Sequence, residues 1–376
     1  MGIYNCHTHI FTLACVPNRA MGVPLANWIS GDRVGRAIAK FANWVTPNSP
    51  KRSLGRYLTF AEIGLSATQK NVFDDLLSVY KEWGTVKFVV LPMDMEQMGA
   101  GLPNKIYRDQ LKEIIDIRKN NSGYADILLP FLFVDPNRFS NGDAVLNFVR
   151  DYIEVHGFVG IKLYPAVGYY PFDEKLDKMY GYAEQHQIPI LTHCTQGPTY
   201  YRGNLDNKRN PRFRPDYLDL KSKDNDDFQR NFTDPRNYRY VLDTLGFRNL
   251  KINLAHYGGA DSMLGRSKKN NGWYPEIKQL MAEFPNVYTD ISYTLYNTDD
   301  DFALYKKLLA DLNDPAIGNK ILFGTDFYVT TPAKPEDKLR DEFYSFLVKN
   351  NSEPIFDKIT QTVPQTYLTS DFYVAD

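Results

Sequence analysis

Eight short apolar runs, separated by helix-like stretches, constrain the fold of this chain more than any other feature. Each run is rich in branched and aromatic side chains and ends near polar residues, Gly or Pro, as β-strands do. The runs are 2–10, 86–94, 126–135, 157–165, 188–195, 250–258, 286–293 and 320–327. Because strands that alternate with helices favour a parallel sheet, eight such units predict an α/β fold, the (β/α)8 TIM barrel.

The stretches between these runs have the spacing of amphipathic helices. Apolar residues recur at helical intervals in 70–84, 143–157, 173–187 and 273–285. With 376 residues, of which 43% are hydrophobic, the chain can bury the core of one large barrel. We therefore expect a single domain over residues 1–376.

Two connections are much longer than ordinary turns, at about 12–60 and 196–233. Each follows a predicted strand and precedes a helix, so both insertions should lie on the C-terminal face of the barrel, where barrel enzymes hold their active sites. The second insertion is rich in Tyr and Arg, and its segment 198–232 is expected to cover the site as a lid. An ordered surface loop with solvated charges is the alternative interpretation.

Charge and cysteine content argue against several function classes. The chain has 44 basic and 45 acidic side chains, a formal net charge of −1, so we expect neither a nucleic-acid nor a membrane-surface partner. No run approaches the ~20 apolar residues of a membrane helix, and no basic and apolar leader precedes the first strand. The three cysteines, Cys6, Cys15 and Cys194, lack Cys-x-x-Cys spacing and favour a reduced, cytoplasmic setting.

The first predicted strand contains "NCHTHIF" at residues 5–11, with two histidines two positions apart. Side chains alternate between the two faces of a strand, so Asn5, His7 and His9 are expected to point the same way. Two imidazoles on one face can reach a single metal ion. A chance pair of hydrogen-bonded histidines is the alternative.

Other predicted strands also end in residues that can bind a metal or transfer protons. His193 ends the fifth strand in "ILTHCT", His256 ends the sixth in "NLAHYGG", and Asp326 ends the eighth in "LFGTDF". Lys162 lies in the fourth strand, in "GIKLYP". Each has an ordinary alternative as a core or capping residue. Because the C-terminal strand ends converge in a barrel, the residues together predict a metal site.

These segments, in this order, resemble the amidohydrolase superfamily over nearly the whole chain. The sequence is most similar to its amidohydrolase 2 family, predicted metal-dependent hydrolases of the TIM-barrel fold. The resemblance implies that His7, His9 and Asp326 bind one metal ion. It also implies that His193 and His256 bind a second ion in a binuclear site; in a mononuclear site, His193 joins the first ion and His256 polarises the substrate.

Lys162 leaves the number of ions open. In binuclear members of the superfamily, a lysine of this strand carries a carboxylate formed from CO2 and bridges the two ions, whereas characterised members of the amidohydrolase 2 branch hold one. We favour a single ion, with Lys162 as a further ligand only if it is carboxylated. Imidazole and carboxylate ligands suit Zn2+ foremost, with Mn2+ or Fe2+ as alternatives.

The expected reaction is hydrolysis of an amide, lactone or ester bond in a small molecule. The ion would lower the pKa of a bound water to roughly 7, Asp326 would move its proton to the leaving group, and His256 would stabilise the developing oxyanion. A metal-dependent decarboxylase or hydratase of a small carboxylic acid is the first alternative. A non-catalytic ligand-binding barrel is the second, although such a protein would be expected to have lost Asp326 or a histidine.

The substrate does not follow from these residues. Arginine offers planar donors to a carboxylate or phosphate, so the arginines of the second insertion are candidate substrate ligands. They are Arg202, Arg209, Arg212 and Arg214. A homo-oligomer is compatible with every feature above.

Overall fold

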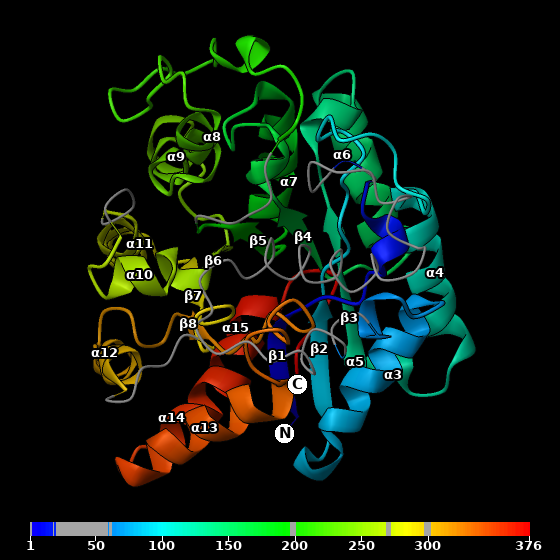
Figure 1. Ribbon diagram of the computed structural model, residues 1–376, viewed down its shortest axis with the longest axis vertical. Helices are drawn as coiled ribbons and strands as arrows, with labels where there is room; N and C mark the ends of the chain where they lie inside the picture. Colours follow the sequence, from blue (N-terminus) through cyan, green and yellow to red (C-terminus); the bar gives the residue numbers. More distant parts are fainter. Residues whose placement is uncertain are drawn as a thin grey trace, which may run out of the picture.

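A computed structural model describes residues 2–17, 19, 59, 62–195, 201–267, 272–296 and 302–376 (Figure 1). The centre is a parallel eight-stranded sheet whose strands follow one another in chain order. The strands are β1 Ile3–Thr8, β2 Val86–Val90, β3 Leu128–Phe133, β4 Gly160–Leu163, β5 Ile190–His193, β6 Ile252–Ala255, β7 Val287–Asp290 and β8 Ile321–Leu322. All eight strands expected from the sequence are confirmed, each shorter than its apolar run.

The two edges of the sheet meet between β1 and the residues around the end of β8. The amide of Cys6 donates to the carbonyl oxygen of Phe323 at 2.9 Å, and the amide of Asp326 donates to that of His7 at 2.9 Å. These bonds make the sheet a nearly closed barrel. The predicted (β/α)8 fold is therefore confirmed.

Helices surround the strands on the outside of the barrel (Figure 1). They are α3 Gln69–Val79, α4 Tyr107–Asn120, α5 Tyr124–Ile127, α6 Gly142–Arg150, α7 Asp177–Gln185, α8 Asn225–Thr233, α9 Arg236–Arg239, α10 Ala260–Met263, α11 Trp273–Glu283, α12 Ala303–Leu312, α13 Glu336–Lys349, α14 Glu353–Asp357 and α15 Val363–Leu368. Side chains cap several of them: Thr68 accepts from the amide of Asn71 at the start of α3, and Asn141 accepts from that of Ala144 at the start of α6.

Apolar side chains form two layers, one inside the barrel and one between the strands and the helices. The inner layer includes Tyr4, Leu129 and Leu322 from three different strands. The C-terminal residue of the chain lies at the end of the barrel where the strands begin. There the hydroxyl of Tyr4 donates to the backbone oxygen of Asp376 at 2.9 Å. The apolar core thus fills the part of the barrel nearer the starts of the strands, and polar residues occupy the C-terminal strand ends.

The two insertions are described in part. The first, 12–60, lies almost wholly outside the described residues, so its predicted position stays a prediction. The second is described except for 196–200. The amide of Arg202 donates to the carbonyl oxygen of Met98, after β2, at 2.6 Å, and α8 packs on the turn Pro165–Val167 that follows β4. The described part of this insertion therefore lies on the C-terminal side of the barrel, as predicted.

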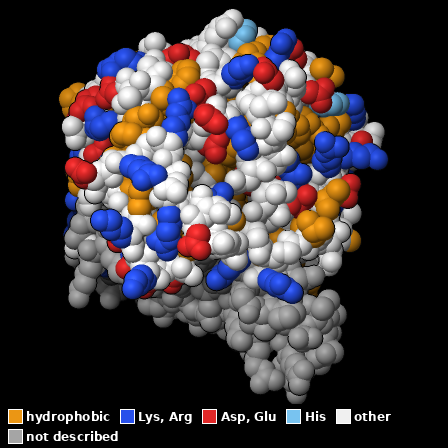
Figure 2. Space-filling view, turned by 90° about the horizontal axis from the view of Figure 1, so that it is seen from above, with side chains coloured by type: hydrophobic (Ala, Val, Ile, Leu, Met, Phe, Trp, Pro, Cys, Tyr) orange, Lys and Arg blue, Asp and Glu red, His pale blue; other side chains and the backbone are white. Residues whose placement is uncertain are grey.

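The surface carries charges of both signs. Figure 2 shows acidic and basic side chains interspersed over the face that it displays, with apolar groups between them. Among the helices that the structure describes, none is both long and apolar enough to span a membrane. The three cysteines are buried and unpaired.

Candidate metal centre

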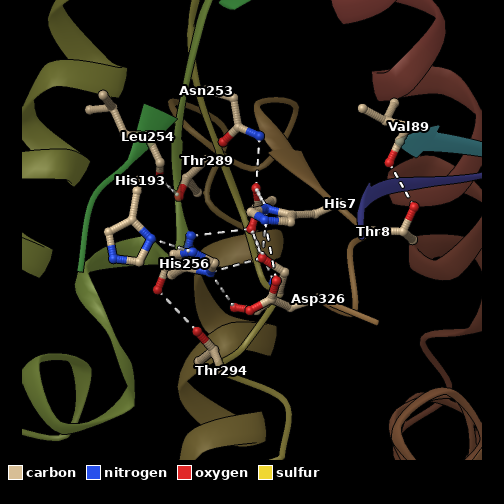
Figure 3. A network of polar contacts seen from close by, with 12 residues as sticks. His7, Thr8, Val89, His193, Asn253, Leu254, His256, Thr289, Thr294 and Asp326 are labelled. Carbon is tan, nitrogen blue, oxygen red and sulfur yellow. Dashed lines mark hydrogen bonds and ion pairs between the residues drawn. The ribbon is translucent and has the colours of Figure 1, made fainter. Parts of the chain in front are cut away.

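His7, His9 and Asp326 come together where β1 meets the segment after β8. The distance from Oδ1 of Asp326 is 3.1 Å to Nε2 of His9 and 3.5 Å to Nε2 of His7. All three side chains are buried, and one ligand atom of each lies within 4.8 Å of the others. Figure 3 shows His7 and Asp326 meeting in one cluster of polar contacts. The spacing suits one metal ion.

In both His7 and His9, Nδ1 already lies at a hydrogen-bond acceptor. Nδ1 of His7 lies 3.1 Å from Oδ2 of Asp290, and Nδ1 of His9 donates to the carbonyl oxygen of Leu91 at 2.8 Å. An imidazole that donates through Nδ1 keeps its lone pair on Nε2, which is how proteins orient metal-binding histidines. Burial lowers the pKa of His7 to about 4, against the raising effect of Asp290. Two imidazoles oriented in this way beside a carboxylate fit a divalent ion.

The prediction for Asn5 is wrong. The register of β1 against β2 shifts between Asn5 and Thr8. Such a bulge places an extra residue on one strand, so the alternation of faces is interrupted. The side chain of Asn5 consequently faces the helices and donates to Oγ1 of Thr325 at 2.8 Å and to the hydroxyl of Tyr80 at 3.1 Å. Only the two histidines of the strand converge on Asp326.

Asp290, the last residue of β7, accepts hydrogen bonds from two histidines of the site, His7 and His256. Its Oδ2 accepts from Nδ1 of His7 and from Nδ2 of Asn253, at 3.1 and 2.8 Å. Its Oδ1 accepts from the amides of His256 and Ser292, both at 3.1 Å. Although burial alone raises the pKa of Asp290, its contacts with His7, His256 and Ser292 hold that pKa far below its ordinary value. The carboxylate is thus an ionised anchor for two histidines.

Sequence reasoning missed Asp290, although a signal was present. The residue is an acid at the C-terminal end of a predicted strand, the same position that singled out Asp326. Asp290 forms a second possible group of metal ligands with His7 and His256. Because both of its oxygens already accept two or more hydrogen bonds, we assign it the role of orienting His7 rather than of binding the ion.

His193 and His256 form a hydrogen-bonded pair beside the cluster. Nε2 of His256 lies 3.0 Å from Nδ1 of His193 (Figure 3), and burial lowers the pKa of both imidazoles. Nε2 of His193 is buried and has no hydrogen-bond partner among the described residues. The structure therefore brings His193 to His256 and not directly to Asp326.

Two residues of the centre have left-handed backbone conformations. The φ angles are 69° at His256 and 61° at Asp326, in a region that residues other than glycine rarely adopt. Such conformations cost of order 1–3 kcal/mol each and persist where the surroundings impose them, often at functional sites. The turns after β6 and β8 thus direct these two side chains at an energetic cost.

Lys162 lies inside the barrel next to the same groups. It is fully buried, and within the described part of the chain its Nζ has no hydrogen-bond partner. Burial lowers the pKa of Lys162 to about 8, although the charges of Asp326 and Asp290 raise it. An amine with a lowered pKa loses its proton more readily, and carboxylation requires that neutral form. The environment therefore suits either an ammonium or a carboxylated lysine.

Comparison with known proteins decides the family. A family model described as amidohydrolase, the amidohydrolase 2 family, matches residues 122–355, which is more than half of the chain. The chain belongs to this amidohydrolase family. No curated protein matches the sequence of this chain.

Solved structures with the same fold include metal-bound proteins. An uncharacterised TIM-barrel protein from Bordetella bronchiseptica has a TM-score of 0.57 at 13% identity, over 98% of each chain. A zinc-bound amidohydrolase from Burkholderia multivorans has a TM-score of 0.55 at 12% identity, over 98% of this chain and 99% of the other. The manganese complex of 5-carboxyvanillate decarboxylase from Novosphingobium aromaticivorans has a TM-score of 0.56 at 12% identity, over 98% and 96%. At these identities the similarity shows the shared fold.

The arginines of the second insertion contact residues outside the histidine cluster of the amidohydrolase. Nη1 of Arg212 donates to Oδ1 and Oδ2 of Asp177, at the start of α7, at 2.9 and 2.7 Å. Nη2 of Arg214 donates to Asn210 at 2.5 Å. These contacts do not bring Arg212 or Arg214 to the cluster. A role for them or for Arg202 in substrate binding stays a prediction.

Asp135, shortly after β3, is another buried carboxyl group at the C-terminal end of the barrel. Its Oδ1 accepts from the amide of Asn137 at 2.8 Å, whereas its Oδ2 has no partner among the residues that the structure describes. Burial raises the pKa of Asp135 to about 7. The folded amidohydrolase therefore retains a proton on Asp135 that the unfolded chain releases above about pH 4.

This difference predicts a pH dependence of stability. Between about pH 4 and about pH 7, rising pH favours the unfolded chain, so Asp135 lowers the free energy of unfolding by up to about 1.4 kcal/mol per pH unit. Asp135→Asn, which keeps the shape and stays neutral, should remove this contribution. Urea unfolding of both proteins across this range measures it. Equal pH slopes for the two proteins would contradict the assignment.

Proposed function

We propose that this amidohydrolase is a metal-dependent hydrolase that cleaves an amide, lactone or ester bond in a small molecule. The observation that carries the proposal is the orientation of His7 and His9. Each has Nδ1 on an acceptor and directs Nε2 at Asp326. Two imidazoles and a carboxylate suit Zn2+, so we propose one Zn2+ here, with His193 as a further ligand.

The residues of the chain divide the reaction between them. A divalent ion at this centre would supply Lewis acidity toward a water molecule and the substrate carbonyl. Asp326 accepts a proton from the attacking water and returns it to the leaving group. Burial raises the pKa of Asp326, but its contacts with His9 and the other nearby imidazoles hold that pKa well below its ordinary value. Asp326 is therefore ionised and ready to act as the base.

We assign stabilisation of the oxyanion to His256, with His193 as its hydrogen-bond partner. His193 and His256 share one hydrogen bond, so a proton of this pair becomes available when the bond opens. Directed at the substrate carbonyl, this N–H donor stabilises the charge that develops on its oxygen. The described part of the insertion 196–233 lies on the same side of the barrel, and we propose that it acts as a lid and shapes substrate choice.

A decarboxylase or hydratase of a small carboxylic acid is the second candidate. Lys162 favours it, because a buried amine whose Nζ has no partner among the described residues suits a substrate carboxylate. The fold shared with the manganese-bound decarboxylase is compatible with the same reaction class. If Lys162 is instead carboxylated, a second ion joins the first and hydrolysis is favoured.

A parallel screen tests the proposal. We expect the purified protein to hydrolyse members of a panel of lactones, aryl esters and amides. Chelation should abolish the activity, and Zn2+ or Mn2+ should restore it. A second panel of aromatic and unsaturated carboxylic acids, assayed for CO2 release and hydration, tests the lyase. Turnover of the acids alone would replace the hydrolase by the lyase, and hydrolysis that survives complete chelation would contradict the metal mechanism.

A further inference from the structure

A buried polar network lies behind the metal centre, between the barrel and its helices. Such layers normally consist of apolar side chains, because a buried polar group costs free energy unless it is hydrogen-bonded. Here four polar side chains are buried together. They are Asn5, Tyr80, Thr325 and Glu336.

Hydrogen bonds join these four side chains into one chain of contacts. The hydroxyl of Tyr80 donates to Oε1 of Glu336 at 2.6 Å. The amide group of Asn5 donates to the hydroxyl of Tyr80 at 3.1 Å and to Oγ1 of Thr325 at 2.8 Å. Its nitrogen also lies 3.4 Å from Oε1 of Glu336, so the shorter bonds between Glu336 and Asn5 run through Tyr80. Tyr80 directly follows α3, and Glu336 is the first residue of α13. The network therefore connects the end of α3 and the start of α13 with β1 and with the segment after β8.

The positions of Asn5 and Thr325 link this network to the metal centre. Asn5 lies two residues before His7, and Thr325 directly precedes Asp326. The strand that carries this part of the seam, β8, spans only Ile321–Leu322. Beyond β8, single backbone bonds such as that from the amide of Asp326 to the carbonyl oxygen of His7 hold the seam, and the side-chain bond from Asn5 to Thr325 adds to them.

The network is anchored on its helix side as well. Glu336 is the first residue of α13, where the positive end of the helix dipole favours a carboxylate. One turn later, the guanidinium of Arg340 lies 5.0 Å from the ring centre of Tyr80 and 4.3 Å from that of Trp83. Nη1 of Arg340 also donates to the carbonyl oxygen of Val79 at 3.1 Å. Two residues one turn apart in α13 thus contact Tyr80: Glu336 at its hydroxyl and Arg340 at its ring.

We propose that Glu336, acting through Tyr80, is a positioning residue that sets the separation between the strand ends carrying His7, His9 and Asp326. The inference rests on the proposed metal centre and adds a residue 10 positions beyond Asp326 that contacts neither ion nor substrate. Asn5 and Thr325 link the network to the proposed ligands, because Asn5 lies two residues before His7 and Thr325 directly precedes Asp326. Loosening the network should widen the three-ligand site and weaken its hold on a metal.

Three variants and one control test the inference, with Co2+ as the probe. Tyr80→Phe removes the hydroxyl that bridges Glu336 and Asn5 and leaves only their direct 3.4 Å contact, whereas Glu336→Leu removes the acceptor of both. Both should weaken Co2+ binding by about 10-fold, the lower end for residues that support ligands, and should alter the visible absorption spectrum of the bound ion. Glu336→Gln keeps an acceptor oxygen and should restore both values. Glu342→Gln, at a partly exposed carboxylate of the same helix that pairs with Lys334, is the control and should leave both unchanged.

The readouts separate positioning from stability. A residue that only supports the fold would lower the unfolding temperature and leave the affinity and spectrum of bound Co2+ unchanged. Wild-type affinity and spectrum in both Tyr80→Phe and Glu336→Leu would overturn the inference, and Tyr80→Phe decides it alone if Glu336→Leu does not fold. If wild-type protein itself bound no Co2+, or bound it equally after His7→Ala, the proposed metal centre would fail and this inference with it.

Discussion

Asp326→Asn is expected to remove activity while the fold is kept. Asparagine is nearly isosteric with aspartate, so the backbone bond from residue 326 to His7 can persist. Its amide cannot accept a proton from the attacking water, so the general-base step is lost. Removal of a general base typically lowers the rate by ~10²–10⁴-fold. Steady-state kinetics on a substrate found in the screen measures this loss, with circular dichroism to check the fold.

Metal occupancy must be measured beside the rate, because an amide is also a poorer ligand than a carboxylate. Asp135→Asn is the matched control, since it makes the same substitution at another strand end whose carboxyl group lies outside the metal centre. Its activity should be unchanged. An Asp326→Asn protein with full metal content and near wild-type turnover would show that Asp326 is not the base. The assignment would then move to His256 or to the lyase.

His7→Ala combined with His9→Ala is expected to empty the metal centre. The double change removes two of the four proposed ligands and leaves only Asp326 and His193 to hold the ion. Affinity for Zn2+ should therefore fall by more than the ~10–100-fold seen when only supporting residues are lost. Elemental analysis of protein purified without chelator, together with competitive titration against a chromophoric chelator, measures the effect.

A matched control uses the two histidines at the other end of the strands. His156 and His186 are partly exposed and pair with surface carboxylates, Asp151 and Asp371. Replacing both by alanine should leave the metal content unchanged. Equal metal content in the two double variants would show that any bound metal lies elsewhere on the chain.

The barrel and the convergence of His7, His9 and Asp326 could be predicted from the sequence because both follow from simple periodicity. Eight apolar runs identify eight strands, and parallel strands bring their C-terminal ends to one edge. His7, His9 and Asp326 therefore had to lie near one another if the barrel closed. Cys194 follows the same alternation: its thiol faces outward to the carbonyl oxygen of Thr233, away from the ring of its neighbour His193.

Other details depend on local geometry that a residue pattern does not contain. The bulge in β1 turns Asn5 to the helices, and no residue type in "NCHTHIF" marks it. The partner of Arg212 lies on a helix distant in sequence, so its ion pair could not be foreseen. Asp290 could have been proposed from its strand-end position, but its role depends on five donors, two of which come from Asn253 and Ser292 side chains.

Anomalous X-ray diffraction from crystals of protein purified without chelator tests the central claim most directly. We predict one strong anomalous peak within ~2.0–2.2 Å of Nε2 of His7, Nε2 of His9 and a carboxylate oxygen of Asp326, the distances of zinc to such ligands. The same map would show whether Lys162 carries a carboxylate beside a second peak. Crystals soaked with Zn2+ that show no peak between these three side chains, at ordered and fully refined positions, would contradict the metal centre.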